Sequence, residues 1–271
     1  MKGTPMHVSD ILADLLAEQA SLDEIVAGLD PEQWELATAS PRWSVTDQIA
    51  HLSYFDRAAA IAIEDPDRFR TERDRLLAAA GGGNEAVDEL TLSDVRAQSV
   101  GDRLTTWRSG RAALEQAAAG LADDARVPWY GPPMGAKSFL TARLMECWAH
   151  GQDIVDAVHA ERLPTDRLRH IAQLGCITRG WTYINRGEVV PEDDVRVDLL
   201  GPSGAMWSWG SEDATNRVSG TALDFCLVTT QRRHVADTDL AAVGRHATDW
   251  LSKAQAFAGP PTNGPAGGPP D

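Results

Sequence analysis

The sequence has little that would tie it to a membrane, a nucleic acid or an oxidising compartment. Its apolar runs are far shorter than the roughly 20 residues of a membrane-spanning helix. Its three cysteines, Cys147, Cys176 and Cys226, are too few and too scattered for a disulfide framework, and no two form a Cys-x-x-Cys pair. Basic residues number 25 against 40 acidic residues, and the net charge of -15 disfavours binding to a phosphate backbone. We therefore expect neither a membrane nor a nucleic-acid partner.

The N-terminal residues 1–5 lead directly into an amphipathic helix and lack the apolar core of a secretory signal. Together with the scarce cysteines, this predicts a cytoplasmic protein with reduced thiols. Cys147 lies beside Glu146 but falls on an apolar stripe of its helix. We interpret it as a buried core thiol rather than a nucleophile, because buried cysteine commonly behaves as a small hydrophobic residue.

The chain of 271 residues, 43% hydrophobic and 24% charged, is typical of a globular protein with one large domain or two ordinary ones. Apolar residues at helical spacing predict long helices over residues 8–29, the segment that follows residue 44, 93–121 and 138–159, which together fit a four-helix bundle. A further helix is expected over 165–186. The glycines at 81–83 lack the preceding strand and the Lys-Ser/Thr pair of a phosphate-binding loop.

The pattern changes after residue 187. Short, partly alternating segments at 195–199, 205–209 and 216–219 predict strands, and helices are expected over 221–232 and 245–257. The predicted fold class is α+β, mostly α, with a helical-bundle domain over 1–187 and a small α+β domain over 188–258. The last residues, 259–271, are rich in Gly and Pro and are predicted to be disordered.

Three polar side chains are candidate metal ligands. Glu146 and His150 are four residues apart on one predicted helix, so they share a face and can converge on one ion, although such pairs also occur in helices that bind nothing. His51 follows Ser44 and Asp47, a predicted helix-capping pair, and is either a third ligand or a hydrogen-bonded core histidine. Two imidazoles and one carboxylate would leave a coordination position free for chemistry.

Two segments resemble a known family. WSVTDQIAHL at residues 43–52 and RLMECWAHGQD at 143–153 resemble the two ligand helices of the DinB-like superfamily, and within it mycothiol-dependent maleylpyruvate isomerase and its uncharacterised actinobacterial relatives. The resemblance covers most of the chain. It implies that His51, Glu146 and His150 bind a divalent cation, usually zinc, and that mycothiol is a cofactor.

The same resemblance suggests further site residues. Asp153 matches an acidic residue that would hold the imidazole of His150 or a neighbouring basic group. From the residues alone, Asp153 would equally well face water or pair with Arg143 or Arg179. In the family, a small domain of lipid-carrier type contributes an arginine that matches Arg232. Here Gln231 replaces the preceding glycine and Arg233 follows, so Arg232 is either a catalytic residue or a solvated cation at a helix C-terminus.

The long loop 122–137 precedes the second ligand helix. Its aromatic residues Trp129 and Tyr130 are predicted to form a substrate-binding wall, or else to cover the end of the bundle. Arg143 is a candidate for holding a carboxylate of the substrate.

These observations predict a metal- and mycothiol-dependent isomerase or S-transferase that acts on a small electrophilic substrate, either anionic or neutral. One alternative is a hydrolase in which the metal activates water. The same ligand set also serves iron oxygenases. Another alternative is a non-catalytic metal-dependent binding or sensor protein, although no basic helix suited to reading DNA is present.

Overall fold

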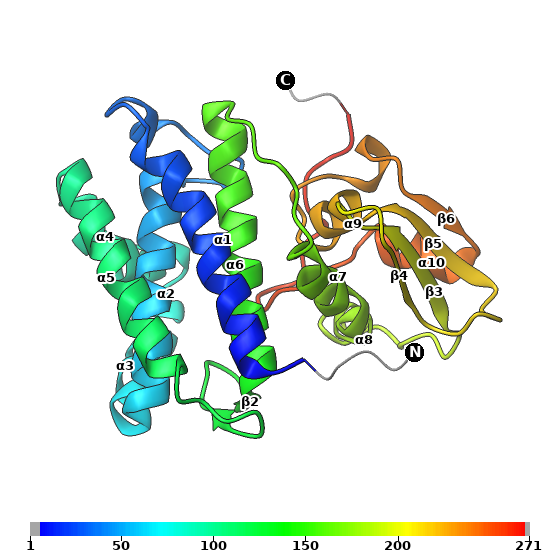
Figure 1. The fold of residues 1–271 in the computed structure, drawn as a ribbon, viewed down its shortest axis with the longest axis horizontal. Helices are drawn as coiled ribbons and strands as arrows, with labels where there is room; N and C mark the ends of the chain where they lie inside the picture. The colour runs from blue at the N-terminus through cyan, green and yellow to red at the C-terminus, as the bar shows by residue number, and fades with distance from the viewer. Residues whose placement is uncertain (1–5, 269–271) are drawn as a thin grey trace. The chain divides into compact units, whose positions relative to one another are not determined.

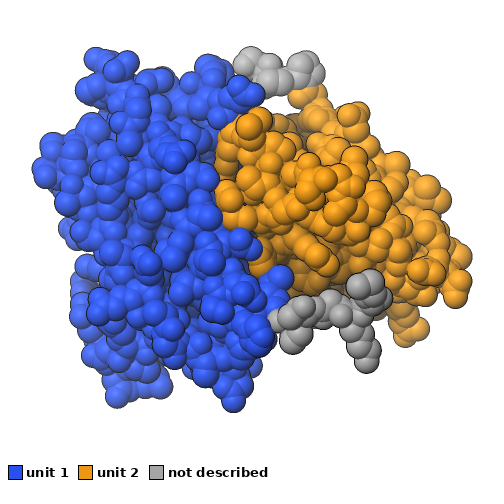
Figure 2. Space-filling model, in the orientation of Figure 1, with its two compact units in different colours: residues 1–161 blue, residues 162–271 orange. Residues whose placement is uncertain are grey.

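The structure is a computed structural model in which residues 6–268 are described. Residues 1–5, examined above for a secretory signal, and residues 269–271 of the predicted disordered tail lie outside the described part. The chain divides into two compact units, Met1–Glu161 and Arg162–Asp271 (Figure 2). The boundary therefore falls earlier than the predicted 187/188, and the helices that follow residue 162 belong to the second unit.

The first unit is the helical bundle that the periodicity predicted. Its elements are α1 (Val8–Ala27), η1 (Gln33–Glu35), α2 (Val45–Glu64), α3 (Pro66–Ala80), α4 (Asn84–Arg96), α5 (Val100–Ala118), β1 (Arg126–Val127), β2 (Met134–Gly135) and α6 (Ala136–Val158). α1 packs against α5 and α6, and α2 packs against the same two helices (Figure 1). These four helices close the bundle, while α3 and α4 form a hairpin beside α2.

The start of α2 is fixed by the predicted cap. Ser44 lies in extended backbone, its hydroxyl accepts from the amide of Asp47, and the Asp47 carboxylate accepts from the amide of Ser44. This reciprocal pair satisfies two backbone donors at the helix end and sets which residues of α2 face the core. Asp47 also forms an ion pair with Arg96 of α4, 2.6 Å between Oδ1 and Nε.

The single helix predicted over 93–121 is wrong, because the chain breaks between α4 and α5. Ser99 adopts extended backbone and caps α5 through the amide of Asp102. Serine at such a position favours a helix start over a helix interior, since its hydroxyl competes for backbone donors. The break lets α4 turn back along α2, where Leu92 and Val95 pack with Ala50 and Trp43.

The second unit is an α+β domain. Its elements are α7 (Leu168–Ile177), α8 (Arg179–Ile184), β3 (Val195–Leu200), β4 (Met206–Trp209), β5 (Asn216–Thr221), α9 (Ala222–Thr229), η2 (Val235–Asp237), β6 (Ala241–Val243) and α10 (Arg245–Leu251). The sheet order is β4-β3-β5-β6, with β3 parallel to β5 and the outer pairs antiparallel. The three predicted strands are confirmed, and β6 is an addition that the sequence did not indicate.

Close packing of α7 against α9 explains why α7 belongs to this unit. A Cβ atom on Gly175 would lie 2.9 Å from Phe225 Cε1, so only glycine lets the two helices approach this closely. Part of the predicted disordered tail is also packed here. Gln231 Nε2 donates to the carbonyl of Thr262, and Asn185 Nδ2 donates to that of Gly259. Residues 259–268 therefore contact the unit rather than lacking structure.

No helix within residues 6–268 combines the length and the apolar character needed to cross a membrane.

Candidate metal centre

Two helices of the first unit bring the three predicted ligands together. His51 lies on α2, and Glu146 and His150 lie one turn apart on α6. Glu146 Oε2 is 3.5 Å from His51 Nε2 and 3.1 Å from His150 Nε2, and one ligand atom from each residue lies within 4.8 Å of the others. Bonds of about 2.0–2.1 Å to a tetrahedral zinc ion would separate its ligand atoms by roughly 3.3 Å. The spacing of the three groups therefore fits a single cation.

A hydrogen-bond chain fixes the orientation of His150. Thr38 Oγ1 donates to the carbonyl of Trp43, and Gln48 Nε2 donates to Thr38 Oγ1 at 2.8 Å. The other amide atom, Gln48 Oε1, is thus an acceptor, and His150 Nδ1 lies 2.6 Å from it. His150 must donate from Nδ1, so in the neutral imidazole Nε2 carries the lone pair.

This tautomer places two acceptors opposite each other. The Nε2 lone pair of neutral His150 faces the Glu146 carboxylate at 3.1 Å, an arrangement that needs a proton or a metal cation between the two atoms. Burial, and to a lesser degree the neighbouring His150, lowers the pKa of His51 to about 4. Burial by itself would raise the pKa of Glu146, but its contacts with His150 and His51 outweigh burial and hold that pKa well below the usual value. An ionised carboxylate beside a neutral imidazole is a donor set suited to a divalent cation.

Aromatic rings enclose the two histidines. The Trp43 ring lies 5.0 Å from the ring of His51 and 5.8 Å from that of His150, and Phe55 lies 4.6 Å from His51. The Trp43 indole N–H donates to Asp88 Oδ1, and the other carboxylate oxygen of Asp88 accepts from Arg42. The Trp43 ring is therefore fixed beside the site, because its face packs on the histidine rings and its indole N–H is hydrogen-bonded to Asp88.

Comparison with known proteins identifies the family. Residues 15–155 match the family model described as the mycothiol maleylpyruvate isomerase N-terminal domain. The chain belongs to this family. The matched segment contains all three candidate ligands of the metal centre.

Relatives of the whole chain support this membership. In two strains of Mycobacterium tuberculosis, a relative described as an uncharacterized protein is 44% identical over 253 residues, which cover 93% of this chain and 97% of the relative. The crystal structures of the mycothiol-dependent maleylpyruvate isomerase and of a mutant of it have TM-scores of 0.56, at 16% and 15% identity, and cover 88% of this chain and 93% of theirs. At that identity the likeness shows the shared DinB-like fold alone.

The second unit has a separate similarity. Residues 192–243 match a family model described as Wyosine base formation. The match covers all four strands of the sheet and α9, and the sequence reasoning did not anticipate it. The expected likeness of this domain to lipid carriers stays a prediction.

Within this family member, Asp153 is buried rather than facing water. Its Oδ2 atom lies 3.8 Å from His150 Nδ1 and accepts a hydrogen bond from Ser40 at 3.1 Å. The shorter contact of His150 Nδ1 is with Gln48, which sequence reasoning missed. Gln48 lies three residues before His51, so helical spacing could have placed it on the ligand face of α2.

The other predicted residues of the first unit surround Arg143. The Arg143 guanidinium carbon lies 5.7 Å from the centroid of the Trp129 ring, and Trp129 stacks on Phe69 of α3 at 5.5 Å. Tyr130 packs edge-on against Trp129 and Phe55. The structure thus brings Trp129 and Tyr130 to Arg143 in one aromatic cluster. Their contact with a substrate stays a prediction.

Arg232, the predicted catalytic arginine, belongs to the second unit, just after α9. Its amide donates to the carbonyl of Leu227, and its Nη1 donates to that of Thr230. The preceding Gln231 has a φ of 59°, a left-handed conformation that glycine adopts more easily. This backbone explains why a glycine is expected at that position. The reach of Arg232 or Arg233 to the metal centre stays a prediction.

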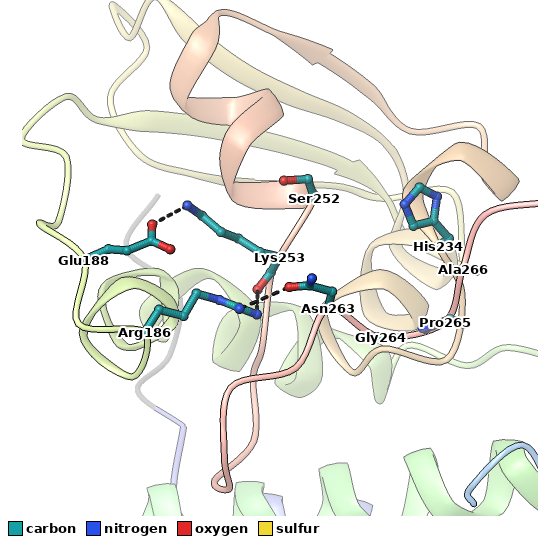
Figure 3. Close-up of a pocket in the computed structure, with 9 residues that line it drawn as sticks. All are labelled: Arg186, Glu188, His234, Ser252, Lys253, Asn263, Gly264, Pro265 and Ala266. Carbon is teal, nitrogen blue, oxygen red and sulfur yellow. Dashed lines mark hydrogen bonds and ion pairs between the residues drawn. The ribbon is translucent and has the colours of Figure 1, made fainter.

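Two other features, the Cys147 thiol and a cavity in the second unit, are weaker candidates for a functional site than the metal centre. Cys147 is buried, as predicted for a core thiol. A polar cavity of about 520 Å³ in the second unit is lined by Arg186, Glu188 and Lys253 (Figure 3). Lys253 is paired with Glu188, and Arg186 donates to Asn263 and to the Lys253 carbonyl. Both of these cations of the cavity are therefore already paired or hydrogen-bonded within the chain.

Proposed function

We propose that this chain is a metal- and mycothiol-dependent enzyme of the maleylpyruvate isomerase type. Its reaction class is addition of a thiol to an electrophilic carbon of a small substrate, ending either in cis–trans isomerisation or in thiol transfer. The observation that carries the proposal is the convergence of His51, Glu146 and His150 in a chain that belongs to this family.

The donor set supports the binding of one divalent cation, of which zinc is the best match to two imidazoles and a carboxylate. When bound, such a cation would lower the pKa of a coordinated thiol so that thiolate is present at neutral pH. The chain's own residues prepare this site: Gln48 holds the tautomer of His150, and Trp43 and Phe55 restrict the access of water to the imidazoles.

Further roles follow from the family pattern. Asp153 would hold the imidazole of His150 or a neighbouring basic group, and Trp129 and Tyr130 would form a wall of the substrate site. Arg232, which belongs to the second unit, would act as a catalytic residue. The substrate is a small electrophile, and no nucleic acid or membrane takes part.

The test uses the full chain loaded with zinc, with the metal content measured by mass spectrometry. Mycothiol is expected to raise the melting temperature, because a ligand of the native state stabilises it. S-methyl mycothiol, which has no free thiol, is the matched control and is expected to give no comparable shift. A chain that holds one zinc ion but neither binds mycothiol nor gains activity with it would refute the proposal. Hydrolysis of a small ester without any thiol would favour activated water instead.

A further inference from the structure

Helix α4 lies beside the bundle and carries a buried carboxylate. Asp88 is 7% exposed and is one of the buried residues of α4 together with Leu92 and Val95, which pack with Ala50 and Trp43. A carboxylate in such a place is costly unless hydrogen bonds compensate for the water that it loses. The partners of Asp88 therefore indicate what it is there to hold.

Those partners are two consecutive residues of the loop before α2. Asp88 Oδ1 accepts from the indole N–H of Trp43 at 3.2 Å, and Oδ2 accepts from Nε and Nη2 of Arg42 at 3.2 and 2.9 Å. Arg42 has a φ of 70°, a left-handed conformation that residues other than glycine adopt at a cost. Such a backbone persists where its surroundings hold it, and Asp88 supplies three of the hydrogen bonds that do so.

The Trp43 ring that Asp88 holds packs on a ligand that lacks a tether of its own. His150 is fixed by its hydrogen bond to Gln48. Among the described residues, the only polar contact given for the His51 ring is that of Nε2 with Glu146, at 3.5 Å. The orientation of His51 therefore depends on the rings packed around it, which include Trp43 at 5.0 Å.

Helix α4 also fixes the start of α2. Arg96, two turns after Asp88, forms the ion pair with Asp47, whose carboxylate accepts from the amide of the capping residue. His51 lies in the second turn behind this cap. Asp88 and Arg96 thus connect α4 to both the loop and the helix start on this side of the metal centre.

We propose that Asp88 is a positioning residue of the metal centre, acting through its hydrogen bond to the Trp43 indole. The bond holds the indole ring against the His51 imidazole and so keeps His51 Nε2 turned toward Glu146. A cation would then meet a ligand that is already oriented, and less conformational freedom is lost on binding. This inference rests on the metal-binding part of the proposed function and adds a residue outside the four-helix bundle that controls it.

The test uses the full chain labelled with 5-fluorotryptophan and observed by ¹⁹F NMR, without metal and with zinc. Trp43→Phe assigns the Trp43 resonance among those of the nine tryptophans. The change of its shift between H₂O and D₂O measures how exposed the ring is. Asp88→Ala removes the acceptor of the indole N–H, and Asp88→Asn keeps a carbonyl oxygen for it. Asp94→Ala is the matched control, because Asp94 is also an aspartate of α4 but is exposed.

Without metal, Asp88→Ala is expected to raise the solvent isotope shift of the Trp43 resonance toward that of free 5-fluorotryptophan and to leave the other tryptophans in place. Its zinc Kd, measured by chelator competition, is expected to rise by about 5- to 10-fold, less than for loss of a residue that bonds a ligand directly. Asp88→Asn should keep both values within twofold of the wild type, and Asp94→Ala should change neither.

Arg42→Gly separates the indole bond from the ion pair. It should change neither the Trp43 resonance nor the zinc Kd, because a pair whose arginine is 45% exposed contributes little and glycine adopts the φ of Arg42 more easily. An Arg42→Gly chain that reproduces the Asp88→Ala result would overturn the inference, since the ion pair would then be the cause.

Three further results would overturn it. An unchanged Trp43 resonance in Asp88→Ala would mean that Asp88 does not hold the ring. A freed ring with a zinc Kd within twofold of the wild type would mean that Trp43 does not orient His51. Shifts of most tryptophan resonances would make Asp88 a residue of general stability. A wild type that binds no zinc would refute the proposed function instead, and the metal-free spectra would still show whether Asp88 holds Trp43.

Discussion

Replacing Gln48 by leucine removes the acceptor of the 2.6 Å hydrogen bond from His150 Nδ1, and we expect the zinc affinity to fall by about 10- to 100-fold. Gln48 is fully buried, so water cannot substitute for its amide. The imidazole would then be free to rotate and to place its proton on Nε2, the atom that faces Glu146. Tenfold corresponds to about 1.4 kcal/mol, so the expected loss is about 1.4–2.7 kcal/mol, a reasonable cost for one buried donor left unpaired.

The affinity is measured by competition with a chromophoric zinc chelator at pH 7.5. Gln152→Leu is the matched control, because Gln152 is a part-buried glutamine on α6, the helix of His150, but bonds Asp156 one turn along that helix at 2.9 Å. Gln48→Glu keeps an acceptor and should retain or increase the affinity. If Gln48→Leu binds zinc within twofold of the wild type, the tautomer argument is wrong.

Two other predictions concern the same region. His51→Ala, Glu146→Ala and His150→Ala should each abolish stoichiometric metal, as measured by mass spectrometry, and metal retained in all three would place the site elsewhere. Burial raises the pKa of Asp56 to about 6, although Arg143 lowers it, so its charge destabilises the fold above pH 6 and protonation restores stability as the pH falls toward about 4. Asp56→Asn should therefore raise the free energy of unfolding at pH 7.5, on the order of 1–3 kcal/mol, and flatten its pH dependence between 4 and 6 in urea titrations. An unchanged unfolding curve would contradict this.

The bundle and the shared face of Glu146 and His150 could be predicted because both depend on local spacing. Apolar residues at helical intervals indicate the long helices, and the separation of Glu146 from His150 places both on one face whatever surrounds them. The cap at Ser44 is equally local. The helix break at Ser99 carries the same kind of signal, but the alanines and apolar residues on both sides outweigh one capping serine in a periodicity argument.

Other features depend on contacts between distant residues. The early unit boundary follows from the approach of α7 to α9 at Gly175, which nothing in the local sequence of α7 reveals. The ordered part of the tail depends on donors such as Gln231 and Asn185, far from it in the sequence. A Gly- and Pro-rich composition indicates low intrinsic order, and specific hydrogen bonds override it. Likewise, the burial of Arg143 Nε and Nη2 without a hydrogen bond to any described residue depends on three-dimensional packing alone.

The placement of the ligands on α2 and α6 has a consequence for the folding of the bundle. A bound cation would act as a cross-link, closing a chain loop of about 95 residues between His51 and Glu146 in a protein whose three cysteines form no disulfide. Such a clamp fastens α2 to α6, the last helix of the first unit, so part of the binding energy becomes folding energy. Chelation should therefore loosen the whole helical domain and expose it to proteases, well beyond the immediate surroundings of the ion.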